Sequence, residues 1–235
     1  MFEIQGKVAI VIGGANGIGK EAVKAILKKG GVPVIADFNE GLGNQTAEEL
    51  NVEFVKVDVS DETQVKEMVS YVVEKYGHLD IMVANAGIGG GGSTLDLPTD
   101  EYEKYIGVNQ NGVFYCSREA IRQMVAQGTG GAVINVSSIL GLVGSAGACF
   151  YNISKGAVRL MTKSMAVEFA PHNIRVNSIH PGYIITGMVN EDVAGAEGIE
   201  RLGKPEEIAH AIIFAIENTF MTGAEIVVDG GYTAQ

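Results

Sequence analysis

Tyr151 and Lys155 lie four residues apart in a helical pattern, so on a helix they share one face and their tips can converge. A phenol beside an ammonium group is an acid–base device. Lowering the pKa of a tyrosine from about 10 to about 7 takes roughly 4 kcal/mol, and a cation in a partly desolvated pocket can supply much of this. Ser138 adds a hydroxyl that could hold a substrate oxygen while its proton moves. Taken alone, Tyr-x-x-x-Lys is common and equally compatible with a surface pair.

The elements that must position these residues alternate between strands and helices. Strands are predicted at Val8–Ile12, Val32–Asp37, Glu53–Asp58, Ile81–Ala84, Ala132–Val136, Arg175–Ile179 and Ile226–Val228. Helices are predicted at about Gly17–Lys29, Thr46–Leu50, Glu62–Tyr76, Glu101–Ala126, Phe150–Phe169 and Pro205–Glu217. Because strands that are apolar throughout are buried on both faces, this alternation predicts a parallel sheet covered by helices. No repeat or linker divides the chain, so we expect one domain over residues 1–235.

Composition excludes several classes of protein. Hydrophobic residues make up 46% and charged residues 19% of the 235 residues, which is typical of a folded domain. The formal net charge of −11 disfavours nucleic acid and anionic membranes as partners. Cys116 and Cys149 show no metal-ligand spacing, no apolar run approaches the roughly 20 residues that span a bilayer, and Met1–Lys7 does not resemble a signal peptide. We therefore expect no metal site and a cytoplasmic location.

Glycines follow the first predicted strand in the spacing G-x-x-x-G-x-G, at Gly13, Gly17 and Gly19. They permit a tight turn and a close approach of backbone N–H groups to a pyrophosphate at the helix N-terminus. Asp37 stands at the end of the second strand, where a carboxylate accepts hydrogen bonds from ribose hydroxyls and repels a 2′-phosphate. No arginine or lysine stands among the glycines or directly after Asp37, so NAD is favoured over NADP. A solvated turn is the alternative reading of Asp37.

Polar residues also end the third and fourth strands. Asp58 could accept a hydrogen bond from an adenine amino group while the backbone of Val59 contacts the ring. Asn85-Ala86-Gly87 could form a turn that stabilises the sheet edge beside the cofactor. Both fall at carboxyl ends of strands, where ligands bind in parallel sheets. A flexible, glycine-rich loop is predicted directly afterwards, over Gly87–Gly92.

Together these motifs resemble the short-chain dehydrogenase/reductase superfamily along nearly the whole chain. The matching residues are Gly13, Gly17, Ile18, Gly19, Asp58, Val59, Asn85, Ala86, Gly87, Asn109, Ser138, Tyr151, Lys155, Asn177, Pro181, Gly182, Thr186 and Val228-Asp229-Gly230-Gly231. The resemblance implies an α/β fold, a Rossmann-like three-layer sandwich with a seven-stranded parallel sheet. It also implies reversible hydride transfer between NAD(P) and a secondary alcohol or ketone.

The resemblance implies a role for each site residue. Tyr151 would be the general acid/base, Lys155 would lower its pKa and bind the nicotinamide ribose, and Ser138 would orient the substrate oxygen. Asn109 would hold, through its backbone, a water that connects Lys155 to solvent. Thr186 and the Ile184 backbone would hold the carboxamide. The expected cofactor contacts also include Asn16, Ile18, Phe38, Pro181 and Gly182.

The sequence departs from the family pattern at three places. Ile12 replaces a common threonine, and Ala84 replaces the first asparagine of Asn-Asn-Ala-Gly. The segment after Thr186 is about ten residues shorter than in many relatives. That segment caps the substrate pocket in the family, and we expect the substrate-cap loop at about 183–204. A short cap could open the site to bulky substrates or weaken its activity.

The expected pocket is apolar and has no obvious fixed cation. The substrate-binding candidates are Ser138, Leu140, Val143, Ala148, Tyr183 and Met188. They favour a neutral, moderately hydrophobic alcohol or ketone. Two other readings remain open, namely a 3-oxoacyl-thioester reductase and a non-catalytic NAD-sensing protein. Long apolar helices, which relatives use for dimer contacts, predict a homotetramer.

Four residues outside these motifs also carry chemistry. His180, directly before Pro181, could look catalytic, but a strand-end histidine with satisfied hydrogen bonds is favoured. Cys149 is expected to fill a small space in the pocket or core. Arg118, paired with Arg122 four residues later, could meet an acidic carrier protein. The charge of −11 favours a solvated face or a subunit contact instead.

Overall fold

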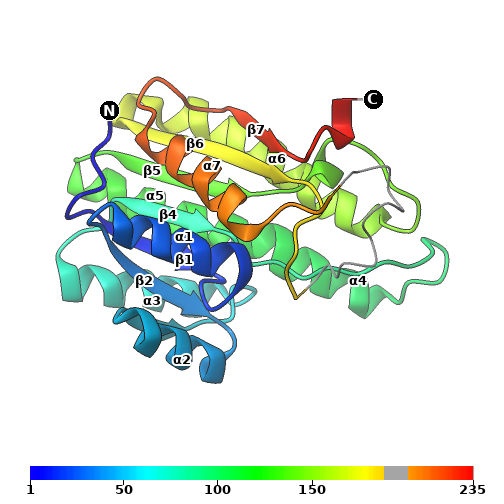
Figure 1. The fold of residues 1–235 in the computed structure, drawn as a ribbon, viewed down its shortest axis with the longest axis horizontal. Coiled ribbons are helices and arrows are strands. Elements are labelled where there is room, and N and C mark those ends of the chain that lie inside the picture. The colour runs from blue at the N-terminus through cyan, green and yellow to red at the C-terminus, as the bar shows by residue number, and fades with distance from the viewer. Residues whose placement is uncertain (188–200, 235) are drawn as a thin grey trace.

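A computed structural model describes residues 1–187 and 201–234, and in them seven strands form one parallel sheet in the order β3-β2-β1-β4-β5-β6-β7 (Figure 1). The strands are β1 (Val8–Ile12), β2 (Val32–Asp37), β3 (Glu53–Lys56), β4 (Ile81–Ala84), β5 (Gly131–Val136), β6 (Ile174–Pro181) and β7 (Glu225–Val228). The helices are α1 (Gly17–Lys28), α2 (Glu40–Leu50), α3 (Glu62–Tyr76), α4 (Thr99–Tyr105), α5 (Val113–Gln127), α6 (Cys149–Phe169) and α7 (Pro205–Glu217). The predicted Rossmann-like α/β class is confirmed.

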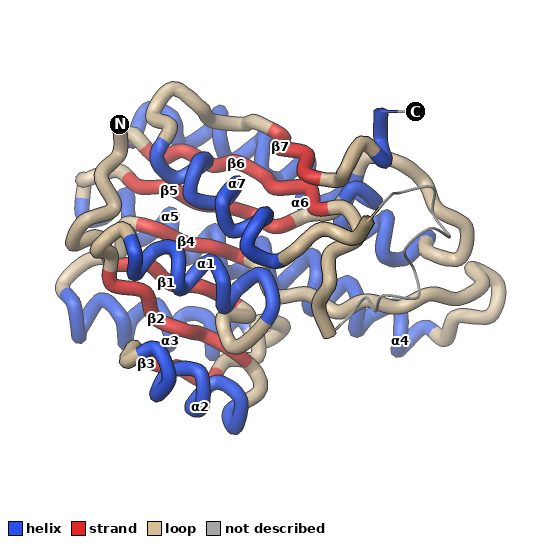
Figure 2. Tube along the Cα trace, in the orientation of Figure 1, coloured by secondary structure: helices blue, strands red, loops and turns tan. Residues whose placement is uncertain are grey.

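Helices cover both faces of the sheet and make three layers. The helices α1, α2 and α7 pack on one face, where Ile26 and Ile212 join the buried side chains of β1 and β4. The helices α3, α5 and α6 pack on the other, where Met68, Met124 and Val158 form a second cluster. Each buried apolar side chain stabilises the fold by roughly 2 kcal/mol. The strands are therefore fixed, and the loops after them gather at one end of the molecule (Figure 2).

Local capping explains where α3 and α2 begin. Asp61 accepts hydrogen bonds from the backbone N–H groups of Thr63, at 2.8 Å, and Gln64, so α3 begins where predicted. The prediction that α2 starts at Thr46 was wrong, because Asn39 caps it from Glu40 by accepting from Leu42 N–H at 3.1 Å. The glycines after Glu40 weaken the helical pattern, but they do not break the helix.

The predicted helix Glu101–Ala126 is divided into three parts. The α-helices α4 and α5 flank a π-helical segment, Ile106–Gly112. A Cβ at Gly112 would lie 2.6 Å from Val59 Cγ2, so this glycine lets the helix approach the sheet edge closely. π-Helical insertions change which side chains face a neighbour and occur frequently at functional sites. A continuous α-helix was therefore the wrong expectation here.

The ends of β3 and β6 differ most from the predictions, whereas β5, β6 and β7 each begin one residue earlier than predicted. β3 ends at Lys56 rather than Asp58, because the Asp58 N–H donates to the Gln64 side chain at 2.9 Å instead of to a strand. β6 extends to Pro181 and stays buried throughout. Both differences bring polar residues to the sheet edge.

The expected substrate-cap loop is held together at its described ends. Ile184 and Gly203 form a parallel bridge, in which Ile185 N–H donates to Gly203 O and Gly203 N–H donates to Tyr183 O, both at 2.9 Å. This pairing brings the two ends of the loop together beside the carboxyl edge. The residues between 188 and 200 lie outside the described part.

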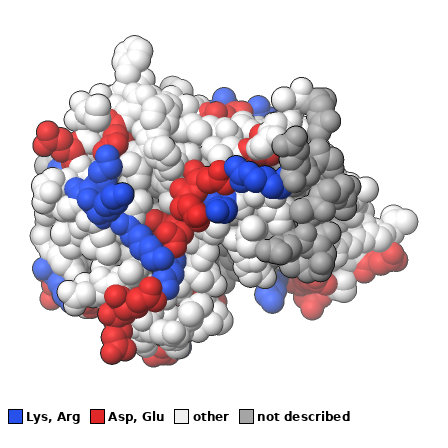
Figure 3. Space-filling model, in the orientation of Figure 1, with Lys and Arg blue, Asp and Glu red and all other residues white. Residues whose placement is uncertain are grey.

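The surface over α1 and α7 carries both signs of charge, in spite of the net charge of −11 (Figure 3). Ion pairs join Lys20 to Glu49 at 2.7 Å and Lys29 to Glu217 at 2.8 Å. Among the described helices, none has the length and apolar character needed to cross a membrane.

Candidate active site

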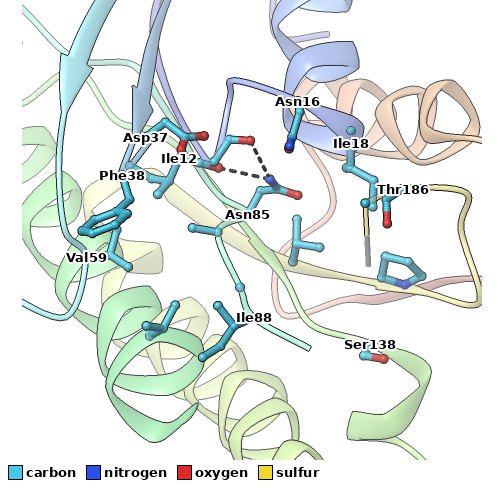
Figure 4. A pocket seen from close by; sticks show the side chains of 18 of the residues that line it. Ile12, Asn16, Ile18, Asp37, Phe38, Val59, Asn85, Ile88, Ser138 and Thr186 are labelled. Atoms are coloured by element: carbon cyan, nitrogen blue, oxygen red, sulfur yellow. Dashed lines mark hydrogen bonds between the residues drawn. The ribbon is translucent and has the colours of Figure 1, made fainter. Parts of the chain in front are cut away.

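A cavity of about 720 Å³ runs along the carboxyl edge of the sheet. Asp37 and Ser138 lie at its opposite ends, with Asn16, Asn85 and Thr186 between them (Figure 4). The predicted residues that line it are Gly13, Asn16, Gly17, Ile18, Asp37, Phe38, Asp58, Val59, Asn85, Ala86, Gly87, Ser138, Tyr151, Lys155, Pro181, Gly182, Ile184 and Thr186. Sequence positions that are far apart thus converge on one elongated site, in the place where α/β folds bind ligands.

The glycine turn after β1 is shaped for close backbone approach. Gly13 has φ +68°, and a Cβ there would lie 3.0 Å from Asn85 Nδ2. A Cβ on Gly19 would lie 2.0 Å from the carbonyl oxygen of Gly13. The α1 N-terminus has no side-chain cap from Asn16 and no acidic residue in its first turn. Its N–H groups and dipole therefore suit an anionic group such as a pyrophosphate.

The Asp37 carboxylate is held at the far end of the cavity by two backbone groups. Oδ2 accepts from Ala15 N–H at 3.1 Å and Oδ1 accepts from Asn39 N–H at 2.9 Å. The remaining lone pairs of the two oxygens stay available, because each oxygen can accept more than one hydrogen bond. The arrangement fixes a negative charge where β2 ends.

Asn85 ties the neighbouring strand ends together. Its Nδ2 donates to Ile12 O at 3.1 Å and to Gly13 O at 3.3 Å, as the dashed lines in Figure 4 mark. Because these carbonyls lie at the start of the glycine turn, the amide holds that turn against β4. Asp58, two residues after the end of β3, accepts from the Ser60 N–H at 2.9 Å.

The catalytic candidates meet at the other end of the cavity. Lys155 Nζ donates to Val136 O at 3.0 Å and lies 5.7 Å from the centroid of the Tyr151 ring. Burial lowers the pKa of Lys155 to about 8. Burial raises the pKa of Tyr151, and a hydrogen bond with the Ser138 side chain opposes this rise. The family resemblance implies a lowered pKa for Tyr151. In this structure the pKa is raised instead, because desolvation of the phenol outweighs the lowering expected from Lys155.

Asn109 lies behind the cavity wall, fully buried in the π-helical segment. Its Oδ1 accepts from Ile88 N–H at 2.8 Å and its Nδ2 donates to Ile88 O at 2.9 Å. A Cβ on Gly87 would lie 3.2 Å from Asn109 Oδ1 and 3.4 Å from Lys155 Nζ. The side chain therefore holds the glycine-rich loop against the lysine, a contact that sequence reasoning did not predict.

Of the predicted substrate-binding residues that the structure describes, only Ser138 lines this cavity. Leu140, Val143 and Ala148 are not among the residues that line this cavity, and Met188 lies outside the described residues. Tyr183 instead lines a second cavity of about 200 Å³ beside Arg201 and Glu207. Loop side chains follow no simple period, so their direction could not be obtained from sequence.

Sequence reasoning also missed residues that line the main cavity and misplaced one. Ile88, Lys104 and Val108 line it from the glycine-rich loop and the α4–π segment. The π-helical segment hides Lys104 and Val108 from prediction, because a 3.6-residue period does not predict which side chains face the site.

Cys149 is exposed and does not fill a space in the pocket or core, so that expectation was wrong. Within the described residues, no three His, Cys, Asp or Glu side chains gather as a metal site requires.

Comparison with known proteins places this arrangement in a family. The sequence model of the protein family described as short chain dehydrogenase matches residues 7–197. This chain belongs to the short-chain dehydrogenase family. A crystal structure of a short-chain type dehydrogenase/reductase from Mycobacterium marinum is similar, with a TM-score of 0.94 and 34% identity, over 100% of this chain and 98% of that one.

Curated relatives of this short-chain dehydrogenase act on different alcohols. The NADP-dependent (R)-specific alcohol dehydrogenase of Lentilactobacillus kefiri is 39% identical, over 99% of this chain and 98% of that protein. Cyclopentanol dehydrogenase of Comamonas testosteroni is 37% identical over 100% of both chains. The 3-alpha-(or 20-beta)-hydroxysteroid dehydrogenase of Mycobacterium tuberculosis is 39% identical, over 97% of this chain and 90% of that protein. The shared activity is that of an oxidoreductase acting on CH–OH groups with a nicotinamide cofactor.

Proposed function

We propose that this short-chain dehydrogenase is an NAD-dependent enzyme that interconverts a neutral, moderately hydrophobic secondary alcohol and its ketone. The observation that carries the proposal is one cavity that has Asp37 and Ser138 at its opposite ends (Figure 4) and that Tyr151 and Lys155 also line. The glycine turn and the α1 N-terminus between them fit a dinucleotide, because side chains there would block its approach.

The bound nicotinamide would supply the hydride donor or acceptor. The chain's own residues manage the oxygen and its proton. Ser138 holds the substrate oxygen by a hydrogen bond, and Tyr151 gives a proton to it during reduction or takes one during oxidation. Because burial raises its pKa, Tyr151 is protonated at neutral pH and is ready to act as the acid. Lys155, fixed by Val136 O, would contribute positive charge beneath the phenol.

The preference for NAD rests on charge at the Asp37 end. A fixed carboxylate there favours ribose hydroxyls and repels a 2′-phosphate. Lys20, the nearest lysine after the glycines in the chain, has its Nζ 2.7 Å from Glu49. The described cations that line the cavity are Lys104 and Lys155. Lys104 belongs to α4, which lies far from β2 in Figure 1, and Lys155 lies at the catalytic end. One relative is NADP-dependent by name, so this preference needs a direct test.

The substrate class rests on the apolar side chains near the catalytic residues. Ile88 and Val108 line the cavity and favour a neutral substrate. Lys104 also lines it, so a test must compare a neutral substrate with an anionic one. Two relatives from Sinomonas cyclohexanicum are named as dehydrogenases of cis- and trans-4-hydroxycyclohexanecarboxylate. A matched pair of cyclohexanol and its 4-carboxylate therefore separates a neutral from an anionic preference.

The test is an initial-rate screen with NAD⁺ and, separately, NADP⁺. Substrates are cyclopentanol, cyclohexanol, 4-hydroxycyclohexanecarboxylate and a hydroxysteroid, and the variants are Tyr151→Phe and the control Tyr102→Phe. We expect NADH formation with a neutral alcohol that falls by at least about 1,000-fold in Tyr151→Phe only. Binding of NADH without turnover of any substrate would refute the proposed activity. A higher kcat/KM for the carboxylate would refute the neutral substrate class.

We also propose that the protein is a cytoplasmic homotetramer. Two surfaces expose large apolar side chains that a subunit contact could bury. Ile153, Leu160 and Val167 lie on α6, whereas Phe214 and Val227 lie on α7 and β7. Two self-complementary surfaces are what a tetramer with twofold axes requires. Sedimentation of the protein as a monomer at micromolar concentration would refute this assembly.

A further inference from the structure

His180 is a buried residue that the acid–base pair does not use. It is the residue before the last in β6, and its side chain is inaccessible to solvent. Its Nδ1 lies 2.9 Å from the carbonyl oxygen of Ser138, and its Nε2 lies 2.9 Å from Ser178 Oγ. Both ring nitrogens therefore have partners, and one partner belongs to the residue that carries the catalytic hydroxyl.

These partners determine which nitrogen carries the proton. A carbonyl oxygen can only accept, so Nδ1 must be the N–H that donates to Ser138. In the neutral ring Nε2 is then an acceptor, and Ser178 donates its hydroxyl to it. The contact of Ser178 Oγ with Ala224 O, at 3.4 Å, is long by comparison. The geometry thus selects the Nδ1–H tautomer.

Ser138 needs such an anchor because main-chain pairing ends beside it. The last hydrogen bond between β5 and β6 runs from Ser137 N–H to Ile179 O at 2.8 Å, and Pro181 has no N–H to continue the ladder. The carbonyl of Ser138, the residue after the last paired one, accepts from Gly141 N–H at 3.0 Å and from the His180 side chain. A side chain therefore joins the catalytic turn to the sheet.

The same turn sets the direction of the Ser138 hydroxyl. Ser138 Oγ accepts from Leu140 N–H at 3.1 Å, so one lone pair is engaged within the turn. If the carbonyl of Ser138 shifts, the turn and the hydroxyl shift with it. A misplacement of about 1 Å at a reacting centre can lower the rate by about 100-fold.

We propose that His180 is a positioning residue for the reaction, and that its Nδ1–H holds the Ser138 carbonyl so that the Ser138 hydroxyl meets the substrate oxygen. This inference rests on the proposed dehydrogenase activity only for the measurements of kcat. His180 acts through Ser138 and is not among the residues that line the cavity.

The charges around His180 bear on its protonation. Burial lowers the pKa of His180, and Arg159 and Lys155 on α6 act in the same direction. The hydrogen bond to Ser138 and the carboxylate of Glu225 on β7 oppose them. The neutral ring, with its single N–H on Nδ1, is therefore the form present at neutral pH and above.

The test compares His180→Leu with His180→Asn. Leucine has no donor, whereas the amide nitrogen of asparagine lies at the same side-chain position as Nδ1 and can reach the same carbonyl. We expect His180→Leu to lower kcat by about 10- to 100-fold with the dissociation constant of NADH changed by less than about twofold. His180→Asn should recover kcat to within about threefold of the parent. Equal kcat in His180→Leu and the parent, or equal losses in both variants, would overturn the proposal.

A second measurement does not depend on turnover. Hydrogen exchange of the segment Ser138–Val143, followed by mass spectrometry, should be at least about tenfold faster in His180→Leu and close to the parent rate in His180→Asn. Equal exchange in all three proteins overturns the proposal. A silent parent enzyme would refute the dehydrogenase activity alone, since exchange still decides the role of His180. If His180→Leu does not fold, Ser178→Ala replaces it, with faster exchange expected and unchanged exchange overturning the proposal.

Discussion

Asn109 and Ile88 are joined by two hydrogen bonds, one to the N–H and one to the carbonyl of Ile88, at 2.8 and 2.9 Å. This side-chain to backbone pair fixes the start of the glycine-rich loop against the π-helical segment. The loop is fixed again at Gly92, whose N–H donates to Gly147 O at 2.7 Å. The wall of the cavity next to Lys155 is therefore held by a side chain that does not line it.

Replacing Asn109 by leucine should release this wall. The backbone groups of Ile88 would lose buried partners, which costs about 1–3 kcal/mol for each unsatisfied group. We expect kcat/KM to fall by at least about 30-fold and hydrogen exchange over residues 87–92 to accelerate. Asn111→Leu, at a half-buried position in the same segment, is the matched control and should change neither quantity by more than about twofold. Unchanged exchange in Asn109→Leu would contradict the clamp.

Replacing Asp37 by asparagine tests the cofactor preference. The amide keeps one oxygen acceptor but removes the charge that repels a 2′-phosphate. We expect the ratio of kcat/KM with NAD⁺ to kcat/KM with NADP⁺ to fall by about 10- to 100-fold, or about 1.4–2.7 kcal/mol. Asp61→Asn at the α3 cap is the control, and its ratio should not change. A parent enzyme that prefers NADP⁺ would refute the preference itself.

The sequence predicted the sheet and the site because both rest on local signals. Strands such as β1 and β4 are apolar runs, and Tyr151 and Lys155 belong to one helix, so their spacing alone sets their proximity. The start of α2 was missed because Gly43 suggests a break. In the structure a Cβ there would lie 2.1 Å from the Phe54 ring, so the glycine is needed for packing.

Non-local partners account for the other failures of prediction. The bond between His180 and Ser138 spans 42 residues, and the clamp of Asn109 on Ile88 spans 21. The periodicity of helices and strands cannot predict such pairs, because only the folded chain brings the two residues together. Tyr183 follows the recognised Pro181-Gly182 motif, yet its ring packs against Tyr232 with 5.6 Å between centroids.

Lys155→Met should raise stability at neutral pH. Burial lowers the pKa of Lys155 from 10.5 to about 8, so below about pH 8 the folded protein carries a buried ammonium group at a cost of up to roughly 3 kcal/mol. Between about pH 8 and 10.5 the unfolded chain binds more protons, and the stability of the parent rises through that window. The excess Tm of Lys155→Met should therefore be larger at pH 7 than at pH 9.5.

Lys163→Met is the matched control for this comparison. Lys163 lies two turns further along α6, with its side chain 46% exposed and its Nζ 2.8 Å from Glu225. We expect its Tm difference from the parent to stay constant between pH 7 and 9.5. An excess Tm of Lys155→Met that is equal at both pH values would show that Lys155 does not titrate in the window.

Alcohol oxidation should accelerate as pH rises, because Tyr151 must lose its proton before it can act as the base. Burial raises the pKa of this phenol above its ordinary value of 10, so the ionised fraction increases throughout the range from pH 6 to 9. With saturating NAD⁺, we expect kcat/KM for oxidation to rise by about tenfold per pH unit. Ketone reduction needs the protonated phenol and should stay nearly constant between pH 6 and 7, where Lys155, with a pKa of about 8, also keeps its charge. A pH-independent oxidation rate would contradict the role of Tyr151 as the base, because only the ionised phenol can take the proton of the alcohol.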